Sequence, residues 1–282
     1  MAIDPDHLTA YEIPEVRQYY SERDCALYAL SLGMGHDPLD RGALRFVGGD
    51  GDVVPFPTMA LVLGHPGFWL GRPDTGVDPV RVVHGEQSIE LLRPLKASGT
   101  VHGKTRVVGL VDKGEGRGAL LYTKKELTTD TGEPVAITRS TTVLRGDGGF
   151  GRSTMSPPPP VELPSCAPDI VTRIDTRPEQ ALIYRWNGDN NPLHVNPDVA
   201  KKAGYERPIL HGLCTFGIAA LAVVKSALGW HGELLRSIGG RFSAPVYPGA
   251  ALEVLLWKTG SFQVRQASDA KVVLNNGFYT CL

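Results

Sequence analysis

The sequence has little cysteine, almost no net charge and no long hydrophobic run. Its four cysteines form no Cys-x-x-Cys pair and lie far apart, at Cys25, Cys166, Cys214 and Cys281. So few scattered thiols in 282 residues exclude a disulfide framework and favour a reducing, intracellular compartment. The 29 basic and 30 acidic side chains leave a formal net charge of −1. A nucleic-acid or anionic-membrane surface needs a basic excess, so neither partner is expected.

Segments that direct a protein to a membrane or to an export route are also missing. The most apolar run, residues 213–224, is too short to span a bilayer and is closed by Lys225. Residues 1–14 lack the basic and apolar regions of a signal peptide, and residues 279–282 match neither a prenylation box nor a peroxisomal Ser-Lys-Leu tail. We therefore expect a soluble protein without membrane insertion, located in the cytoplasm, with the peroxisome as the alternative.

A stretch rich in glycine and proline divides the chain into two parts of similar length. Glycines cluster in residues 146–151, and prolines follow at positions 157–160 and 164. Prolines in series give a stiff, extended spacer with few backbone donors. The expected organisation is an N-terminal domain over residues 1–150, a linker over 151–165 and a C-terminal domain over 166–282.

The two parts share a series of landmarks in the same order. Residues 21–24 and 176–179 both have the pattern of a helix N-cap followed three positions later by an acid, which is a capping box. The helix that follows ends at a glycine in each case. An apolar segment then opens at Pro57 in the first part and at His211 in the second. This order indicates one structural unit used twice.

The later portion of each part has short, β-rich segments separated by glycine-containing turns, a pattern typical of an antiparallel meander. The segment from Leu213 to Leu228 is apolar on nearly all sides, so most of its surface must be covered. A curved sheet can cover such a helix, and two sheets placed side by side close two exposed edges. The expected fold class is α+β, with two antiparallel sheets each wrapped around a central helix. The predicted strands are 89–95, 106–111, 119–127, 135–144, 238–246, 252–257, 262–267 and 271–274.

The most informative segment, residues 188–194, reads Gly-Asp-Asn-Asn-Pro-Leu-His. It follows a predicted helix over 179–186 and places an acid, Asp189, five positions before an imidazole, His194. Seventeen residues later, His211-Gly212 opens the apolar helix, whose first N–H groups have no acceptor within the helix. An acid and a base on one rigid loop, near free backbone N–H groups, are the parts needed to add water beside a carbonyl group or to remove it.

Asp189 and His194 also have a purely structural interpretation. Asp189 lies in a turn-rich stretch, and His194 precedes the expected cap of a short helix at Asn196. The combined pattern, with His211-Gly212 at this distance, favours function. In the first part, Met34 stands where Asp189 would be. If this position served only the fold, both copies would suit similar residues, so the first part is expected to have lost catalysis.

Four sets of residues carry a resemblance to a known family. Residues 184–194 read Tyr-Arg-Trp-Asn-Gly-Asp-Asn-Asn-Pro-Leu-His, and residues 208–217 read Pro-Ile-Leu-His-Gly-Leu-Cys-Thr-Phe-Gly. The other sets are His-Gly-Glu-Gln at 84–87 and Asp-Lys-Gly-Glu-Gly at 112–116. With these motifs the chain resembles the MaoC-like and type 2 (R-specific) enoyl-CoA hydratases in their tandem double-hotdog form. The resemblance covers almost the whole chain and is looser between residues 35 and 80.

The resemblance implies a reaction and a role for each matched residue. Asp189 and His194 are the catalytic pair that handles the water and the α-proton, and the N–H of Gly212 is the oxyanion donor to the thioester carbonyl. The reaction is the reversible syn hydration of a trans-2-enoyl-CoA to a (3R)-3-hydroxyacyl-CoA, without a metal or a redox cofactor. We expect a homodimer. The residues expected to bind the acyl-CoA substrate are His84, Gly85, Lys113 and Phe242, together with Asn191.

Several of these residues keep a second interpretation. Asn191 is more typical of a side chain that holds the loop through bonds to the backbone, and His211 of a structural residue before a helix. Lys113 suits a hairpin turn as well as a CoA contact. A zinc site made of His194, His211 and Cys214 fits no zinc spacing. The glycines at 114, 116 and 118 have no βαβ unit around them, so they do not indicate a nucleotide loop.

One segment departs from the family pattern. Some members carry a glutamate in the first half before the Pro-Thr segment, where this chain has Val-Gly-Gly-Asp at 47–50. We expect residues 37–78 to form the mouth of the acyl pocket, widened for a long or branched acyl group because bulk is lost there. Two rival functions remain. One is a hotdog thioesterase, which would release free CoA thiol, and the other is a non-catalytic acyl-CoA-binding or partner subunit.

Overall fold

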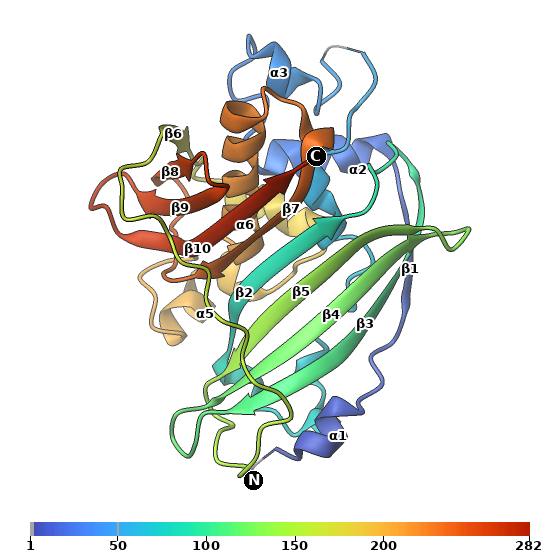
Figure 1. The fold of residues 1–282 in the computed structure, drawn as a ribbon, viewed down its shortest axis with the longest axis vertical. Coiled ribbons are helices and arrows are strands. Elements are labelled where there is room, and N and C mark those ends of the chain that lie inside the picture. The colour runs from blue at the N-terminus through green and yellow to red at the C-terminus, as the bar shows by residue number, and fades with distance from the viewer. Residues whose placement is uncertain (1–2, 50) are drawn as a thin grey trace.

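The chain folds into one ten-stranded antiparallel sheet that curves around its helices (Figure 1). The computed structural model describes residues 3–49 and 51–282. The strand order is β1-β3-β4-β5-β2-β7-β10-β9-β8-β6, so each half of the chain supplies five neighbouring strands. The first half contains β1 (Val16–Tyr20), β2 (Val82–Leu91), β3 (Gly99–Asp112), β4 (Ala119–Thr129) and β5 (Pro134–Leu144). The second contains β6 (Ile170–Asp175), β7 (Leu235–Phe242), β8 (Ala251–Trp257), β9 (Ser261–Gln266) and β10 (Val272–Cys281).

The two halves repeat one topology and join at the centre of the sheet. In the first half β3, β4 and β5 form a meander, and β2 lies on the far side of β5; β8, β9, β10 and β7 repeat this arrangement. The predicted meander is therefore correct for three strands of each half and wrong for β2 and β7. These two strands pair with each other instead, with Ile89 opposite Ile238, because each then covers an edge that the other leaves exposed. The outer strands β1 and β6 were not predicted.

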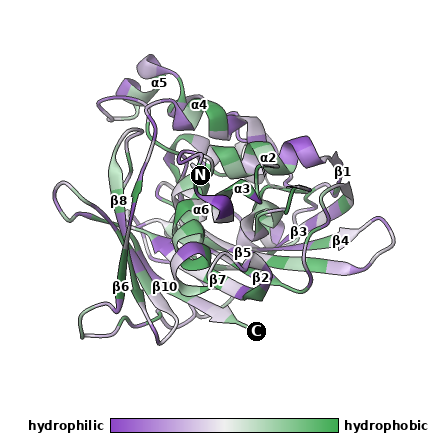
Figure 2. Ribbon diagram, turned by 90° about the horizontal axis from the view of Figure 1, so that it is seen from above, coloured by the Kyte–Doolittle hydropathy of each residue, from purple (hydrophilic) through white to green (hydrophobic). Residues whose placement is uncertain are grey.

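The helices gather on one side of the sheet, as the view from above shows (Figure 2). No helix in the described ranges is both long and apolar enough to cross a membrane. The α-helices are α1 (Pro5–Thr9), α2 (Glu22–Ser31), α3 (Arg41–Leu44), α4 (Gln180–Tyr184), α5 (Pro197–Lys202) and α6 (Gly212–Ala222). Short 3₁₀ turns span Pro57–Leu61, Trp69–Gly71, Pro73–Thr75, Pro79–Arg81, Arg185–Asn187, Pro192–His194 and Gly232–Leu234, and a π turn over Val223–Ala227 continues α6.

Of the two predicted capping boxes, only the first is present. The backbone N–H of Ser21 donates to the Asp24 carboxylate at 2.8 Å, at the start of α2. The prediction at 176–179 is wrong, because Thr176 is engaged elsewhere. Its hydroxyl donates to the Ala250 carbonyl at 2.7 Å and accepts from the Gly249 N–H at 2.9 Å. The helix therefore begins later, at Gln180.

The expected central helix is present in the second half but not in the first. Nine of the eleven residues of α6 are buried, as its apolar sequence predicts. The matching segment of the first half is only the 3₁₀ turn Pro57–Leu61, because Gly64 follows at φ +59° with its backbone pressed against Gly103. Lys125 compensates. Its buried ammonium group donates to the carbonyl oxygens of residues 60, 61 and 63 at 3.2, 2.8 and 2.5 Å.

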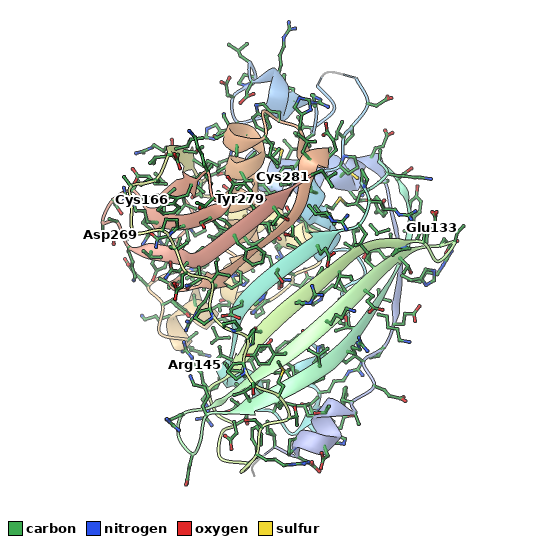
Figure 3. The ribbon with its side chains drawn as sticks, viewed as in Figure 1. Glu133, Arg145, Cys166, Asp269, Tyr279 and Cys281 are labelled. Carbon is green, nitrogen blue, oxygen red and sulfur yellow. The ribbon has the colours of Figure 1, made fainter. Side chains whose placement is uncertain are left out.

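The segment between the halves has no helix or strand from residue 145 to 169 and runs along the outside of the sheet (Figure 1). The Asp112 carboxylate accepts the N–H groups of Gly149 and Gly151 at 2.8 Å, which fixes the start of the segment to the end of β3. The Val161 carbonyl accepts from Asn276 in β10 at 2.6 Å. Figure 3 shows Glu133 and Arg145 at opposite ends of β5. The spacer is therefore attached to both halves by hydrogen bonds.

Candidate active site

Residues 188–194, called the acid–base loop below, begin where a helix is forced to end. After the turn Arg185–Asn187, Gly188 adopts φ +106°, a left-handed conformation that favours glycine. The Asp189 carboxylate accepts the Asn191 N–H at 3.1 Å, and the Asn191 side-chain oxygen accepts the Leu193 N–H at 3.0 Å. These Asx turns set the shape of the loop locally. The prediction that Asn191 holds the loop through backbone bonds is confirmed.

His194 ends the loop in a buried position with a fixed orientation. It is only 8% exposed, and its Nδ1 lies 2.9 Å from the Ile209 carbonyl oxygen. A carbonyl can only accept, so Nδ1 carries the proton and Nε2 of the neutral ring keeps its lone pair. Burial lowers the pKa of His194, and the Ile209 carbonyl and the Asp189 charge oppose this only in part. The ring is therefore a base at neutral pH.

Asp189, His194 and His211 lie close together. One carboxylate oxygen and one nitrogen of each imidazole ring lie within 4.8 Å of one another. Two polar atoms about 4.6 Å apart can both hydrogen-bond one water molecule, each at about 2.8 Å. Asp189 is exposed, whereas His194 and His211 are buried, so the cluster lies where the protein interior meets solvent. An acid and a base can thus act on a single water.

His211 holds the acid–base loop against the start of α6. Its Nε2 lies 3.3 Å from the Asp189 backbone carbonyl oxygen, and its ring stacks on that of His194 with 3.8 Å between centroids. Burial and the neighbouring His194 lower the pKa of His211 to about 4. The neutral ring therefore donates from Nε2 to the carbonyl. The structural role predicted for His211 agrees with this contact, which also makes it a positioning residue of the site.

The stacked imidazoles are a poor arrangement for a metal ion. Their planes differ by only 29°, so their lone pairs run side by side instead of meeting at one point, as metal ligands must. The zinc candidate also included Cys214, whose Sγ lies 3.5 Å from the Ser31 carbonyl oxygen. Burial raises the pKa of the Cys214 thiol, which disfavours the thiolate that zinc needs. Cys214 therefore lies outside the cluster.

Gly212 opens α6 next to residues from both halves. As the first residue of the helix, its N–H has no acceptor within the described ranges 3–49 and 51–282. A Cβ at this position would lie 3.3 Å from the Phe242 ring, so glycine lets this ring pack closely against the backbone. The Phe242 ring in turn packs against that of His84 in β2, with 4.7 Å between centroids. The structure thus brings three predicted site residues together.

His84 and Gly85 lie where β2 is irregular. The register with β5 shifts between His84 and Glu86, and a Cβ on Gly85 would lie 3.0 Å from the Thr141 carbonyl oxygen. Gly85 thus has a structural requirement of its own. The His84 Nε2 is buried without a hydrogen-bond partner in the described part of the chain. Burial lowers the pKa of His84 to about 4, and hydrogen bonding to Glu86 and Gln87 and the charge of Asp189 oppose this only in part.

Two further residues complete the account of the predicted site. Lys113 is exposed in the turn after β3, where its N–H donates to the Gly118 carbonyl at 3.1 Å, which agrees with the hairpin interpretation. His65 is exposed in a Gly-His-Pro-Gly turn, where its Nδ1 accepts the Gly67 N–H at 3.0 Å. Asp50, in the departing segment, lies outside the described residues.

Comparisons with known proteins agree with this geometry. Residues 18–146 match the MFE-2 hydratase 2 N-terminal domain, and residues 161–276 match the MaoC like domain. The chain is 38% identical to the peroxisomal enoyl-CoA hydratase 2 of Arabidopsis thaliana, over 95% of this chain and 93% of that protein. A MaoC-like dehydratase structure from Phytophthora capsici superposes with a TM-score of 0.86 at 33% identity, covering 98% of both chains.

The fold prediction is confirmed by a more distant structure. A Mycobacterium tuberculosis protein described as a double hotdog fold superposes with a TM-score of 0.57 at 15% identity, over 96% of this chain and 94% of that one. At this identity the likeness concerns the fold alone. It agrees with the two five-stranded halves joined edge to edge.

Proposed function

Because the chain belongs to the family of MaoC-like and type 2 enoyl-CoA hydratases, we propose that it catalyses the reversible hydration of trans-2-enoyl-CoA to (3R)-3-hydroxyacyl-CoA. It is an enzyme of the enoyl-CoA hydratase type. The observation that carries the proposal is that one carboxylate oxygen of Asp189 and one ring nitrogen of His194 lie within 4.8 Å of each other, in a cluster with His211, the residue that precedes Gly212. These groups supply the acid–base pair and the oxyanion donor that the reaction needs.

In the hydration direction, Asp189 and His194 share two proton transfers. One group takes a proton from water as the oxygen bonds to C3, and the π electrons of the alkene move onto the thioester oxygen. The Gly212 N–H, at the positive end of α6, stabilises the negative charge that develops there. A proton then reaches C2 from the same side, so the addition is syn. His84, Gly85, Phe242 and Asn191 line the substrate site in this proposal, and Lys113 binds the CoA portion.

The proposal includes no metal and no redox cofactor, since the acid, the base and the oxyanion donor all come from the chain and CoA is part of the substrate. The near-parallel rings of His194 and His211 support this.

We also propose separate roles for the parts of the chain. Residues 1–150 form a domain that binds substrate without catalysing, residues 151–165 link the two domains, and residues 166–282 form the domain that carries the chemistry. Residues 37–78 form a wide acyl-pocket mouth; a panel of enoyl-CoA chain lengths would contradict this if only short acyl groups reacted.

We also propose a homodimer and a cytoplasmic location, with the peroxisome as the alternative. The apolar side chains of Leu182 and Trp186, 51% and 74% exposed near the acid–base loop, offer surface that a second copy can cover. All four cysteines are free, including the exposed Cys166 and Cys281 (Figure 3), which suits a reducing compartment. Sedimentation at micromolar concentration tests the dimer, and a fluorescent fusion tests the location.

The test of the activity follows two signals in one assay with trans-2-enoyl-CoA. A hydratase removes the ultraviolet absorbance of the conjugated enoyl thioester and releases no thiol. A thioesterase would release CoA thiol, which a thiol-reactive dye detects. A non-catalytic binding subunit would change neither signal. Product analysis on a chiral column must give the 3R alcohol; the 3S alcohol would contradict the proposal.

A further inference from the structure

Ser31, in the half without the acid–base pair, has contacts that neither the motifs nor the proposed chemistry uses. It is the last residue of α2 and is completely buried. Its hydroxyl accepts from the Asn187 side-chain N–H at 2.9 Å and donates to the Tyr28 carbonyl at 2.6 Å. Its carbonyl oxygen accepts from Gln180 at 3.1 Å and faces the Cys214 thiol at 3.5 Å. One residue of the first half thus meets three elements of the second.

Those three elements are the ones that position the proposed chemistry. Asn187 ends the turn that leads directly into Gly188 and Asp189. Cys214 lies in the first turn of α6, two residues after Gly212. Gln180 is the first residue of α4, which precedes the acid–base loop. Through Ser31, the segment that carries the acid and the helix that carries the oxyanion donor have a common reference point.

Both side-chain N–H protons of Asn187 have hydrogen-bond acceptors. Its side-chain amide has two protons, one donated to the Ser31 hydroxyl and the other to the Tyr184 carbonyl at 2.9 Å. The end of α2 packs closely on α6, because a Cβ on Gly217 would lie 2.5 Å from the Leu32 side chain. Close packing and these bonds together restrict the arrangement of the turn at 185–187.

We propose that Ser31 is a positioning residue for the reaction: its hydroxyl, acting through Asn187, sets the place of Asp189 relative to His194 and Gly212. The inference rests on the proposed function and extends it by giving the first half a role in the geometry of the chemistry. A displacement of about 1 Å at reacting groups can cost about a hundredfold in rate. Loss of one hydrogen bond that holds the turn should therefore affect kcat more than KM.

The experiment compares kcat and KM of the full-length protein with trans-2-enoyl-CoA for Ser31→Ala, Asn187→Ala and the double variant. We expect kcat to fall about tenfold or more in each single variant, with KM within about threefold. The double variant should be no slower than the slower single variant, because both changes break the same contact. Asn187 is only half-buried, so Asn187→Ala keeps the test decisive if Ser31→Ala fails to fold.

Tyr20→Phe is the matched control. Tyr20 is 3% exposed in the same half, and its hydroxyl donates to the Lys96 carbonyl at 3.0 Å, away from the loop. This variant loses a buried hydroxyl as Ser31→Ala does, and it should keep kcat. Equal kcat in Ser31→Ala and wild type, equal kcat losses in Ser31→Ala and Tyr20→Phe, or losses that multiply in the double variant, would each overturn the inference.

The variants give a different pattern of results if the proposed function itself is wrong. If Asp189→Asn and His194→Gln both kept wild-type kcat, the proposed roles would fall and the role of Ser31 with them. If those variants were inactive while Ser31→Ala and Asn187→Ala kept wild-type kcat, only the inference about Ser31 would fall.

Discussion

The two halves of this chain share a sheet topology and differ in what the sheet surrounds. The second half surrounds α6, an apolar helix whose first residue is Gly212, and its acid–base loop carries the exposed Asp189. The first half surrounds a 3₁₀ turn of five residues, and Met34, at the position that corresponds to Asp189, is 2% exposed in the core. The repeated sheet therefore tolerates the loss of both the long helix and the acid.

The first half still contributes to the site, by contact. His84 packs against Phe242, and Ser31 binds the turn before the acid–base loop. Since β2 and β7 are neighbours in one continuous sheet, these contacts have a fixed geometry. The comparison suggests that one copy of the unit supplies the chemistry and the other supplies surroundings, which variants placed in equivalent positions can test.

The largest expected effect comes from the acid–base pair itself. Asp189→Asn and His194→Gln should each lower the hydration rate by about two orders of magnitude or more, the size of a lost acid–base group. The matched control is His36→Gln, at an exposed residue of the corresponding first-half loop, which should keep wild-type turnover. The measurement is the initial rate at which each folded variant removes the enoyl absorbance. Equal losses in both loops would abolish the distinction between the halves.

The next effect concerns the backbone donor. Gly212→Pro removes the N–H at the first helical position, where proline is well tolerated, and the preceding residue is already extended at φ −57° and ψ 136°. Gly212→Ala adds a Cβ near Phe242 but keeps the N–H. We expect kcat of the proline variant to be about a hundredfold below that of the alanine variant. Similar kcat values in the two variants would remove the oxyanion role from this N–H.

The pH dependence should show that the imidazole works as a neutral base. Burial lowers the pKa of His194 below its ordinary value of 6.5, so kcat/KM should fall on the acid side only below pH 6.5, by about tenfold per pH unit. A kcat/KM profile that turned at or above pH 6.5 would contradict the assignment.

The stability of the folded protein should also fall on acidification. Burial lowers the pKa of both His84 and His211 to about 4 in the folded protein. Between pH 6.5 and 4 the unfolded chain therefore binds more protons, so stability falls as the pH drops through this range. Thermal unfolding measured between pH 4 and 8 checks this; a Tm that rose on acidification would be the opposite result.

The smallest effect on turnover should come from the first-half core. Lys125→Met leaves three carbonyl oxygens without their donor, so the free energy of unfolding should fall by about 2–4 kcal/mol. We expect kcat to stay within about threefold. The adjacent Lys124→Met removes a surface pair with Glu126 and should cost less than about 1 kcal/mol. Urea unfolding of both variants compares them, and equal costs would deny Lys125 its structural role.

Much of this structure was predictable from the sequence, and the failures have physical causes. Short β-rich segments between glycine-containing turns identified eight of the strands, and a segment that is apolar on nearly all sides identified the buried helix α6. The position of β2 next to β7 was not predictable locally, since it depends on which edges need covering. The acid–base loop was found because turn residues and chemistry share one short segment. Ser31 was missed because its neighbours come from distant parts of the chain, as the bond from Asn187 to Ser31 shows.

The most direct test of the central claim follows the oxygen atom. The protein is incubated with trans-2-enoyl-CoA in water enriched in oxygen-18, and the product is analysed by mass spectrometry. The account predicts label in the C3 hydroxyl of an intact (3R)-3-hydroxyacyl-CoA, at a rate that Asp189→Asn lowers by about two orders of magnitude. Two results would contradict it. One is label in a free carboxylate together with free CoA thiol, and the other is an Asp189→Asn variant that labels the C3 hydroxyl at the wild-type rate.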